Sequence, residues 1–199
     1  MPKPATDTWR VFIAVELPPE VRARLAQHVD SLRKVIPDVR ASWARQENLH
    51  LTLKFLGEVP IAKVEVLSVA AGAAARASDH FDLVVGGCGA FPPHGNPRVL
   101  WIGIEDQSGK LARLYQALED ECARAGFARE ARPFHPHLTI TRVRQPRGSR
   151  KLAQLHKQSG FASESVAVSE LVVIRSELSS EGSRYTIISR HAFRASQAK

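Results

Sequence analysis

The sequence predicts an α+β fold built from two related lobes that face one another. Strand-like and helix-like segments are mixed along the 199 residues without strict strand–helix–strand alternation, which argues against a doubly wound parallel sheet. A pattern of histidine, leucine, threonine and an apolar residue occurs at positions 50–53 and again at 137–140, each time in a strand-like segment. No linker divides the chain, so we expect one two-lobed domain over residues 1–199, with residues 1–8 and 195–199 as tails.

The first half of the chain predicts three strands and two helices. Residues 9–17 alternate β-favouring side chains and predict a strand. Pro18 and Pro19 then open a helix, because proline suits a first helical turn, and Pro37 ends it. Residues 39–45 and 49–57 are two further strand candidates. A second helix begins at Val59-Pro60 and runs through an alanine-rich stretch to about Ala77.

The second half predicts five strands and two helices. Residues 81–90 and 98–104 form a pair of strands joined by a turn-rich segment of proline, glycine and asparagine. An amphipathic helix covers residues 111–125 and is closed by Gly126. A strand over residues 134–143 leads into a basic loop, after which Ser149 is expected to cap a short helix to about Gln158. Residues 165–177 and 184–193 are the last two predicted strands.

Composition bounds the kind of partner. A formal net charge of +8 favours an anionic partner such as RNA, DNA or a phosphorylated metabolite. No stretch approaches the roughly 18 consecutive apolar residues that a membrane span needs, and the first residues contain no apolar signal-peptide core. We therefore expect a cytoplasmic monomer that does not contact a membrane. Cys88 and Cys122 are too few for a disulfide framework or a zinc site made of cysteines, and we interpret both as buried or half-buried thiols.

The repeated motif places the same two functional groups on one face of each strand. Residues two apart in a strand point to the same side, so His50 shares a face with Thr52, and His137 shares a face with Thr139. The leucines between them face the opposite side, toward a core. If the lobes face each other, two imidazoles and two hydroxyls converge on a common cleft.

Two imidazoles and two hydroxyls suit the cleavage of a phosphodiester without a metal. A neutral imidazole can take a proton from water, and an imidazolium can give one to the leaving oxygen, each with a contribution of about 10²–10⁴-fold. Threonine hydroxyls can donate hydrogen bonds to the non-bridging phosphate oxygens. Arg142 lies five positions after His137, so it points away from this face in an ideal strand and reaches the phosphate only if the strand ends or twists there.

Chance does not explain the repetition, because a random chain of this composition contains the four-residue pattern only about 0.05 times. A zinc site is the alternative use of these residues: His135 and His137 flank Pro136, and His50 would complete a three-histidine set. Pro136 disturbs strand geometry at that point, and a zinc site leaves both threonines without a role. We therefore expect no metal and no cofactor.

The motifs and their surroundings resemble the 2H phosphoesterases, and within them the RNA 2′,3′-cyclic phosphodiesterase (2′-5′ RNA ligase) family. The resemblance spans nearly the whole chain. The segments that carry it are Arg10–Ala14, Trp43, Asn48–Gly57, Phe91-Pro92, Arg98–Trp101 and His135–Arg142.

The resemblance implies two pseudo-symmetric lobes of antiparallel sheet with flanking helices and an active-site cleft between them. It implies metal-independent hydrolysis of a 2′,3′-cyclic phosphate at an RNA end, or on a small cyclic nucleotide, to a 2′-phosphomonoester. His50 would be the general acid and His137 the general base. Thr52, Thr139 and Arg142 would bind the phosphate. Phe12 is a candidate for stacking on the terminal base, with an ordinary core aromatic as the alternative.

Two other functions remain open at this point. The same site could join RNA ends through a 2′-5′ bond, with an RNA 5′-hydroxyl in place of water. A non-catalytic RNA-binding module would also account for the basic charge. We interpret the basic loop as a contact for the RNA backbone or as a solvated loop; its cations are Arg142, Arg144, Arg147, Arg150 and Lys151. We interpret four further histidines as surface or strand-end residues: His28, His80, His156 and His191.

Overall fold

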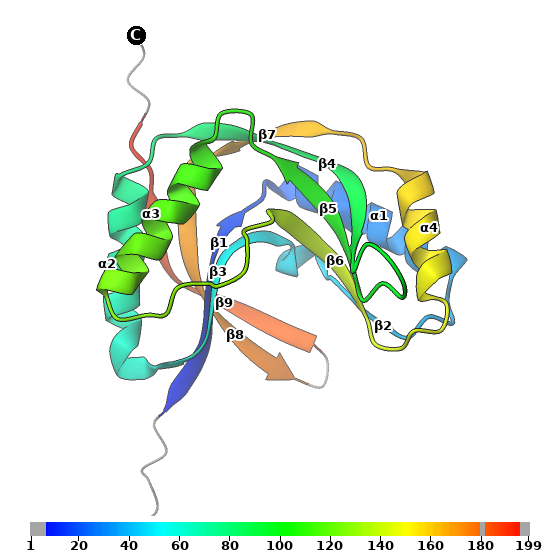
Figure 1. The fold of residues 1–199 in the computed structure, drawn as a ribbon, viewed down its shortest axis with the longest axis horizontal. Helices are drawn as coiled ribbons and strands as arrows, with labels where there is room; N and C mark the ends of the chain where they lie inside the picture. Colours follow the sequence, from blue (N-terminus) through cyan, green and yellow to red (C-terminus); the bar gives the residue numbers. More distant parts are fainter. Residues whose placement is uncertain (1–6, 180–181, 196–199) are drawn as a thin grey trace, which may run out of the picture.

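The structure is a computed structural model that describes residues 7–179 and 182–195. Its elements, in chain order (Figure 1), are β1 (Thr8–Glu16), α1 (Pro19–Val35), β2 (Ala41–Trp43), the short 3-10 helix η1 (Gln46–Asn48), β3 (His50–Pro60), α2 (Ile61–Arg76), β4 (Phe81–Phe91), β5 (Val99–Glu105), α3 (Lys110–Arg124), β6 (His137–Val143), α4 (Ser149–Ser159), β7 (Glu164–Val168), β8 (Glu170–Ser179) and β9 (Gly182–Ala192).

The strands form two antiparallel sheets with matching topology. Sheet A has the order β3-β1-β8-β9, and sheet B has the order β2-β6-β5-β4-β7. When β3 is matched to β6, the next three strands of each sheet correspond in turn, and β2 is one extra strand at the edge of sheet B. The α+β architecture with two related lobes is therefore confirmed.

A pair of helices covers the outer side of each sheet (Figure 1). Helices α2 and α3 pack together against sheet A, and α1 and α4 pack against sheet B. Helix α1 follows a strand of sheet A yet packs in the other lobe, and α3 follows a strand of sheet B yet packs against α2. The lobes are thus interleaved, and one core cluster contains Ile13 and Leu51 of sheet A together with Leu100 and Leu138 of sheet B.

The first helix shows how local sequence produces these elements. Pro19 occupies its first turn, where the missing N–H costs nothing, and Glu20 complements the positive end of the helix dipole. Val21, Leu25 and Val29 recur at helical spacing and are buried. Burial of each such side chain stabilises the fold by about 1.5–3 kcal/mol, which is what holds α1 against sheet B.

The segment predicted as a single strand over residues 165–177 is in fact two strands in different sheets. Strand β7 ends at Val168 and pairs with β4 in sheet B, whereas β8 begins at Glu170 and pairs with β1 in sheet A. The backbone carbonyl of Ser169 between them accepts a hydrogen bond from the N–H of Phe193 at 2.8 Å. Both halves consist of β-favouring residues, so no local signal marks the point where the chain crosses between lobes.

Three smaller expectations also need correction. Ser149 does not cap α4: it is the first helical residue, its Oγ donates to the carbonyl of Pro146 at 2.8 Å, and Gly148 with φ of 77° is the cap. The strand expected over 39–45 is only β2. Thr8, assigned to the N-terminal tail, already pairs with Pro60 in sheet A. Residues 1–6 and 196–199 of the expected tails lie outside the described residues. Within the described chain, no helix has the length and apolar character to span a membrane.

Candidate active site

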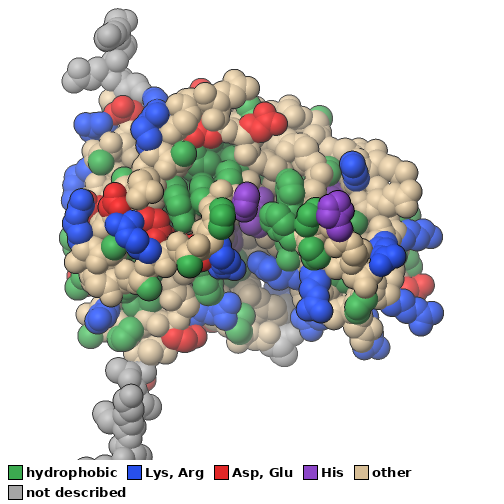
Figure 2. Space-filling model, in the orientation of Figure 1, with side chains coloured by type: hydrophobic (Ala, Val, Ile, Leu, Met, Phe, Trp, Pro, Cys, Tyr) green, Lys and Arg blue, Asp and Glu red, His purple; other side chains and the backbone are tan. Residues whose placement is uncertain are grey.

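The two motif strands belong to different sheets but lie in contact with each other. Strand β3 is the edge strand of sheet A, and β6 is the second strand of sheet B. We call the side of each sheet turned away from its helix pair the inner face. Figure 2 shows a hollow in the lower middle of the molecule, with lysine and arginine side chains gathered around it. The fold therefore brings together the two strands that carry the motif, which are far apart in the sequence.

The motif side chains divide between the two faces as the strand period requires. Leu51 and Leu138 are fully buried in the core, whereas the histidines and threonines on either side of them are half-buried on the inner faces. Thr52 lies opposite Ala14 of β1, and Thr139 lies opposite Trp101 of β5. Each sheet thus presents one imidazole and one hydroxyl.

A bulge lies at the fourth residue of each motif. The pairing of β3 with β1 skips Leu53, and the pairing of β6 with β5 skips Ile140. An extra residue in one strand reverses the side-chain alternation beyond it. Thr141 is consequently buried, and Arg142 is exposed on the same face as His137. This bulge is the physical reason why Arg142 reaches the site although ideal alternation points it away.

In sheet A the equivalent bulge turns Lys54 into the core and Phe55 outward. Lys54 is 4% exposed, and its Nζ donates to Glu119 Oε1 of α3 at 2.6 Å and to the carbonyl of Ala128 at 2.8 Å. Phe55 is 47% exposed at the position that corresponds to Arg142, with the guanidinium of Arg10 4.8 Å above its ring centroid. The two lobes therefore present different groups beside their histidines: a cation in sheet B and an aromatic ring in sheet A.

Both imidazoles are anchored by the backbone two residues before them. Nδ1 of His137 donates to the carbonyl of His135 at 2.6 Å, and the ring of His50 is hydrogen-bonded to the backbone of Asn48. This arrangement leaves Nε2 of each ring for chemistry. Nε2 of His50 lies 3.1 Å from Oγ1 of Thr52. His135 thus orients His137 through its carbonyl rather than through its side chain.

Aromatic rings enclose each imidazole. His50 stacks on Phe12 with a centroid separation of 4.7 Å and meets Tyr185 edge-on at 5.3 Å. Around His137, Phe91 lies edge-on at 5.2 Å, and Trp101 lies at 6.3 Å. These contacts fix the orientations of the two imidazole rings.

Burial disfavours the charged form of both imidazoles. It lowers the pKa of His50 to about 4, against the opposing effect of the hydrogen bond to Asn48. It also lowers the pKa of His137, assisted by the positive charge of Arg142 and opposed by the hydrogen bond to the His135 carbonyl. Both rings are accordingly neutral at pH 7 in the free protein.

Phe12 has no free ring face on which a base could stack. Its side chain is only 3% exposed, because His50 and Tyr185 cover it. This burial favours the alternative noted for it, a core aromatic, with the added property that it supports His50. The exposed ring nearby is Phe55, which lies opposite Phe12 in the sheet.

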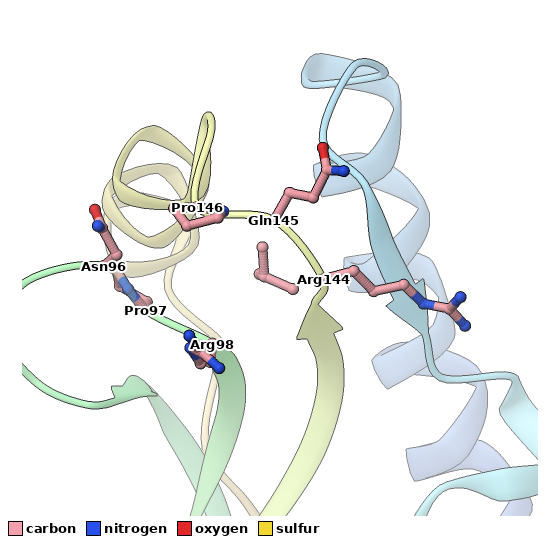
Figure 3. Close-up of a pocket in the computed structure, with 7 residues that line it drawn as sticks. Asn96, Pro97, Arg98, Arg144, Gln145 and Pro146 are labelled. Carbon is pink, nitrogen blue, oxygen red and sulfur yellow. The ribbon is translucent and has the colours of Figure 1, made fainter.

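Two of the five cations in the basic loop after β6 are held by other parts of the protein. Arg144 Nε donates to Ser42 Oγ at 2.8 Å, and Arg150 Nε donates to Asn96 Oδ1 at 3.0 Å. A pocket of about 80 Å³ lies between this loop and the β4–β5 loop (Figure 3), with Arg98 at its wall. A larger cavity of about 510 Å³ is lined by Asp38, Arg40, Gln145 and Arg147. Neither contains a motif residue.

The alternative zinc set is not assembled. Among the described residues, the three-membered group of possible metal-binding side chains lies elsewhere and contains none of His50, His135 and His137. His135 is exposed.

Sequence reasoning missed the residues that pack around the histidines. Tyr185 comes from the last strand and Phe91 from the end of β4, so no local spacing connects them with the motifs. The position of Trp101 could have been predicted in part. It lies between the apolar residues Leu100 and Ile102, which are buried in the core, so strand alternation places Trp101 on the inner face.

The chain is similar over nearly its whole length to known proteins. The family model described as the 2′-5′ RNA ligase superfamily matches residues 17–179. A relative from Methanothermobacter thermautotrophicus, named RNA 2′,3′-cyclic phosphodiesterase, is 34% identical over 178 residues, which cover 89% of this chain and 95% of the relative. A relative of the same name from Escherichia coli is 32% identical and covers 94% and 98%.

Solved structures agree with these relatives. A Thermus thermophilus protein has a TM-score of 0.76 at 29% identity, covering 94% of this chain and 100% of its own. Escherichia coli LigT in complex with 3′-AMP has a TM-score of 0.71 at 30% identity, covering 94% and 99%. The family match, the identities over both chains and the shared two-lobed fold show that this chain belongs to the 2′-5′ RNA ligase superfamily, a family of phosphoesterase enzymes.

Proposed function

We propose that the protein hydrolyses the 2′,3′-cyclic phosphate at an RNA end to a 2′-phosphomonoester, with His50 and His137 as the acid–base pair. The main observation behind the proposal is that both sheets carry the same pair of groups. Each has a threonine and a backbone-anchored imidazole on its inner face. The names of the curated relatives support the substrate class, and the net charge of +8 suits a polyanion.

The proposed reaction breaks one phosphorus–oxygen bond and forms another. Nε2 of His137 takes a proton from water while the water oxygen attacks phosphorus. The bond from phosphorus to O3′ breaks, and the imidazolium of His50 gives its proton to O3′. The product carries a 2′-phosphate and a 3′-hydroxyl, and the histidines have exchanged protonation states, which solvent restores. Thr52 and Thr139 donate to the non-bridging oxygens.

The electrostatic surroundings favour His137 as the base, whereas His50 can act as the acid only once a negative charge lies nearby. Arg142 lowers the pKa of His137, which keeps that ring neutral and ready to accept a proton. His50, with a pKa lowered to about 4, needs a source of negative charge to become the acid. A bound phosphate anion provides it, because an opposite charge within about 4–6 Å favours the protonated form. Substrate binding therefore charges the acid.

Product analysis with an oligonucleotide that ends in a 2′,3′-cyclic phosphate tests the proposal. A 2′-phosphate product is expected, and a 3′-phosphate product would mean that O2′ left instead. His50→Ala and His137→Ala should each lower kcat by about 10²–10⁴-fold, whereas His80→Ala, on an exposed residue, serves as the matched control. EDTA should leave the rate unchanged. Equal rates for the wild type and either motif variant would refute the catalytic roles.

Ligation is a second candidate, favoured by the name of the superfamily. It uses the same groups in reverse, with an RNA 5′-hydroxyl in place of water, so microscopic reversibility permits it. The high concentration of water favours hydrolysis. Adding a 5′-hydroxyl RNA to the same assay separates the two by joined and hydrolysed products. If the protein is instead a non-catalytic RNA-binding module, neither product should form. RNA binding should then survive substitution of either histidine.

A further inference from the structure

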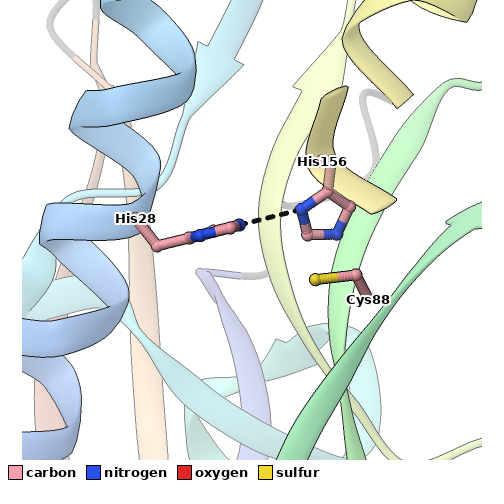
Figure 4. Close-up of side chains that lie close together, drawn as sticks. All are labelled: His28, Cys88 and His156. Carbon is pink, nitrogen blue, oxygen red and sulfur yellow. Dashed lines mark hydrogen bonds between the residues drawn. The ribbon is translucent and has the colours of Figure 1, made fainter. Parts of the chain in front are cut away.

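A second group of reactive side chains lies on the helix-covered side of sheet B. His28 of α1, His156 of α4 and Cys88 of β4 point toward one another (Figure 4), and their ligand atoms all lie within 4.8 Å of one another. His156 is 1% exposed, so its interpretation as a surface residue is wrong. The group is separate from the proposed catalytic histidines, which occupy the inner faces.

His156 is oriented as a metal-binding histidine is. Its Nε2–H donates to the backbone carbonyl of Trp101 at 3.0 Å, which fixes the tautomer and leaves the lone pair of Nδ1 directed at His28. Nε2 of His28 lies 2.9 Å from that Nδ1 and donates to it. Two imidazole nitrogens and one sulfur therefore lie close together, and the hydrogen bond to the Trp101 carbonyl holds the ring of His156 in place.

The three groups carry no charge at neutral pH. Burial lowers the pKa of His28 to about 4, with a further lowering by His156, and burial also lowers the pKa of His156. Burial raises the pKa of the Cys88 thiol to about 11. A cation would reverse this situation, because a bound metal converts a thiol into its thiolate and needs neutral imidazoles as ligands.

We propose that His28, Cys88 and His156 bind a thiophilic divalent first-row cation, of which Zn²⁺ is the representative, with water as the fourth ligand. A mixed nitrogen and sulfur donor set of this kind selects such ions. Tetrahedral bonds of about 2.0 Å to nitrogen and 2.3 Å to sulfur require separations of about 3.3 Å between the nitrogens and about 3.6 Å from nitrogen to sulfur. Nε2 of His28 and Nδ1 of His156, now 2.9 Å apart, must separate by a few tenths of an ångström. Sγ of Cys88, which lies within 4.8 Å of both nitrogens, must move closer to them.

Metal binding at this site releases one proton. The S–H proton of Cys88 leaves to solvent as the sulfur–metal bond forms. His28 frees Nε2 by passing to its other tautomer, which loses the Nε2 proton and gains one at Nδ1. The metal would then join α1, α4 and β4, and so clamp both outer helices of sheet B to the strand beside Trp101. This proposal departs from the expectation of no metal, which was drawn from the motif histidines.

Cobalt substitution tests the ligand set directly. The full chain, dialysed against EDTA, is titrated with Co²⁺ in the absence of RNA. One equivalent should produce a near-ultraviolet charge-transfer band from thiolate to cobalt. Cys88→Ala should abolish the band, and Cys122→Ala, which removes the other cysteine thiol, should retain it. Absence of the band in the wild type, or its survival in Cys88→Ala, would overturn the proposal. Metal bound only by the catalytic histidines gives no thiolate band.

Two measurements on the unmodified chain make the test independent of folding of the variants. Zn²⁺ should protect Cys88 from iodoacetamide, read by mass spectrometry, and should displace about one proton per ion in calorimetry at pH 7. At 100-fold above its dissociation constant, Zn²⁺ should raise Tm by about 5–10 °C. Equal alkylation of Cys88 with and without Zn²⁺ would refute the site. Hydrolysis of cyclic phosphate in EDTA is read separately, so failure of this proposal and failure of the proposed function are distinguishable.

Discussion

Replacing Arg142 by alanine should reduce kcat/KM for cyclic-phosphate hydrolysis by about 10- to 150-fold. The bulge at Ile140 places Arg142 on the same face as His137, where its guanidinium can donate to a phosphate oxygen. A hydrogen bond to a charged group contributes about 1.5–3 kcal/mol, and 1.36 kcal/mol corresponds to a factor of ten, which gives the expected range. The loss should fall on both kcat and KM, since the phosphate is already charged in the ground state and its oxygens gain negative charge in the transition state.

The same substitution should also move the pH profile. The charge of Arg142 lowers the pKa of His137. Its removal therefore raises that pKa, and the limb of the kcat/KM profile that reports His137 should shift to higher pH. A residue that only stabilised the fold would lower the rate without moving this limb.

The matched control is Arg144→Ala. Arg144 carries the same charge two positions later, but its Nε donates to Ser42 Oγ. Steady-state kinetics of both variants from pH 4 to 8, with a cyclic-phosphate oligonucleotide at fixed salt, separates a specific phosphate contact from a general loss of positive charge. If Arg142→Ala loses no more activity than Arg144→Ala, and the limb that reports His137 stays in place, the argument from the bulge is refuted.

Four further predictions follow from the site and its supports. Both limbs of the kcat/KM profile should lie below pH 6.5, because burial lowers the pKa of His50 and of His137 in the free enzyme; a limb above pH 7 would contradict this. Since the unfolded chain binds the proton that folded His50 resists, stability is full above pH 6.5 and falls toward pH 4. The free energy of unfolding can be measured with urea at pH 7 and at pH 4.5. The loss of stability between these two pH values should be about 2 kcal/mol smaller in His50→Gln than in the wild type. Lys54→Met should cost about 3–5 kcal/mol by leaving Glu119 buried without its partner, and adding Glu119→Leu should recover most of that loss; a single-variant cost below about 1 kcal/mol would contradict the buried pair. Phe12→Leu should lower kcat about 2- to 10-fold with little change in KM, because the ring that supports His50 is lost, and an effect confined to KM would argue against that support.

Prediction from the sequence succeeded where the information was local. The helix at 19–35 follows from proline at its start and an apolar stripe at helical spacing. The division of the motif into inner and core side chains follows from the strand period of two, and Leu51 and Leu138 are both fully buried as expected. Prediction failed at residue 169, because the composition on both sides of the crossing is equally β-favouring.

By itself, the sequence determined the two histidines, the threonines that share their faces and the mixed α+β class, since each depends on spacing within a few residues. The tertiary structure decided the rest. It set which sheet each strand joins, it placed Arg142 on the inner face through the bulge at Ile140, and it brought His28 and Cys88 to the same point. These outcomes depend on pairing and packing between segments distant in the chain, and the free energies of those contacts are not encoded in any local pattern.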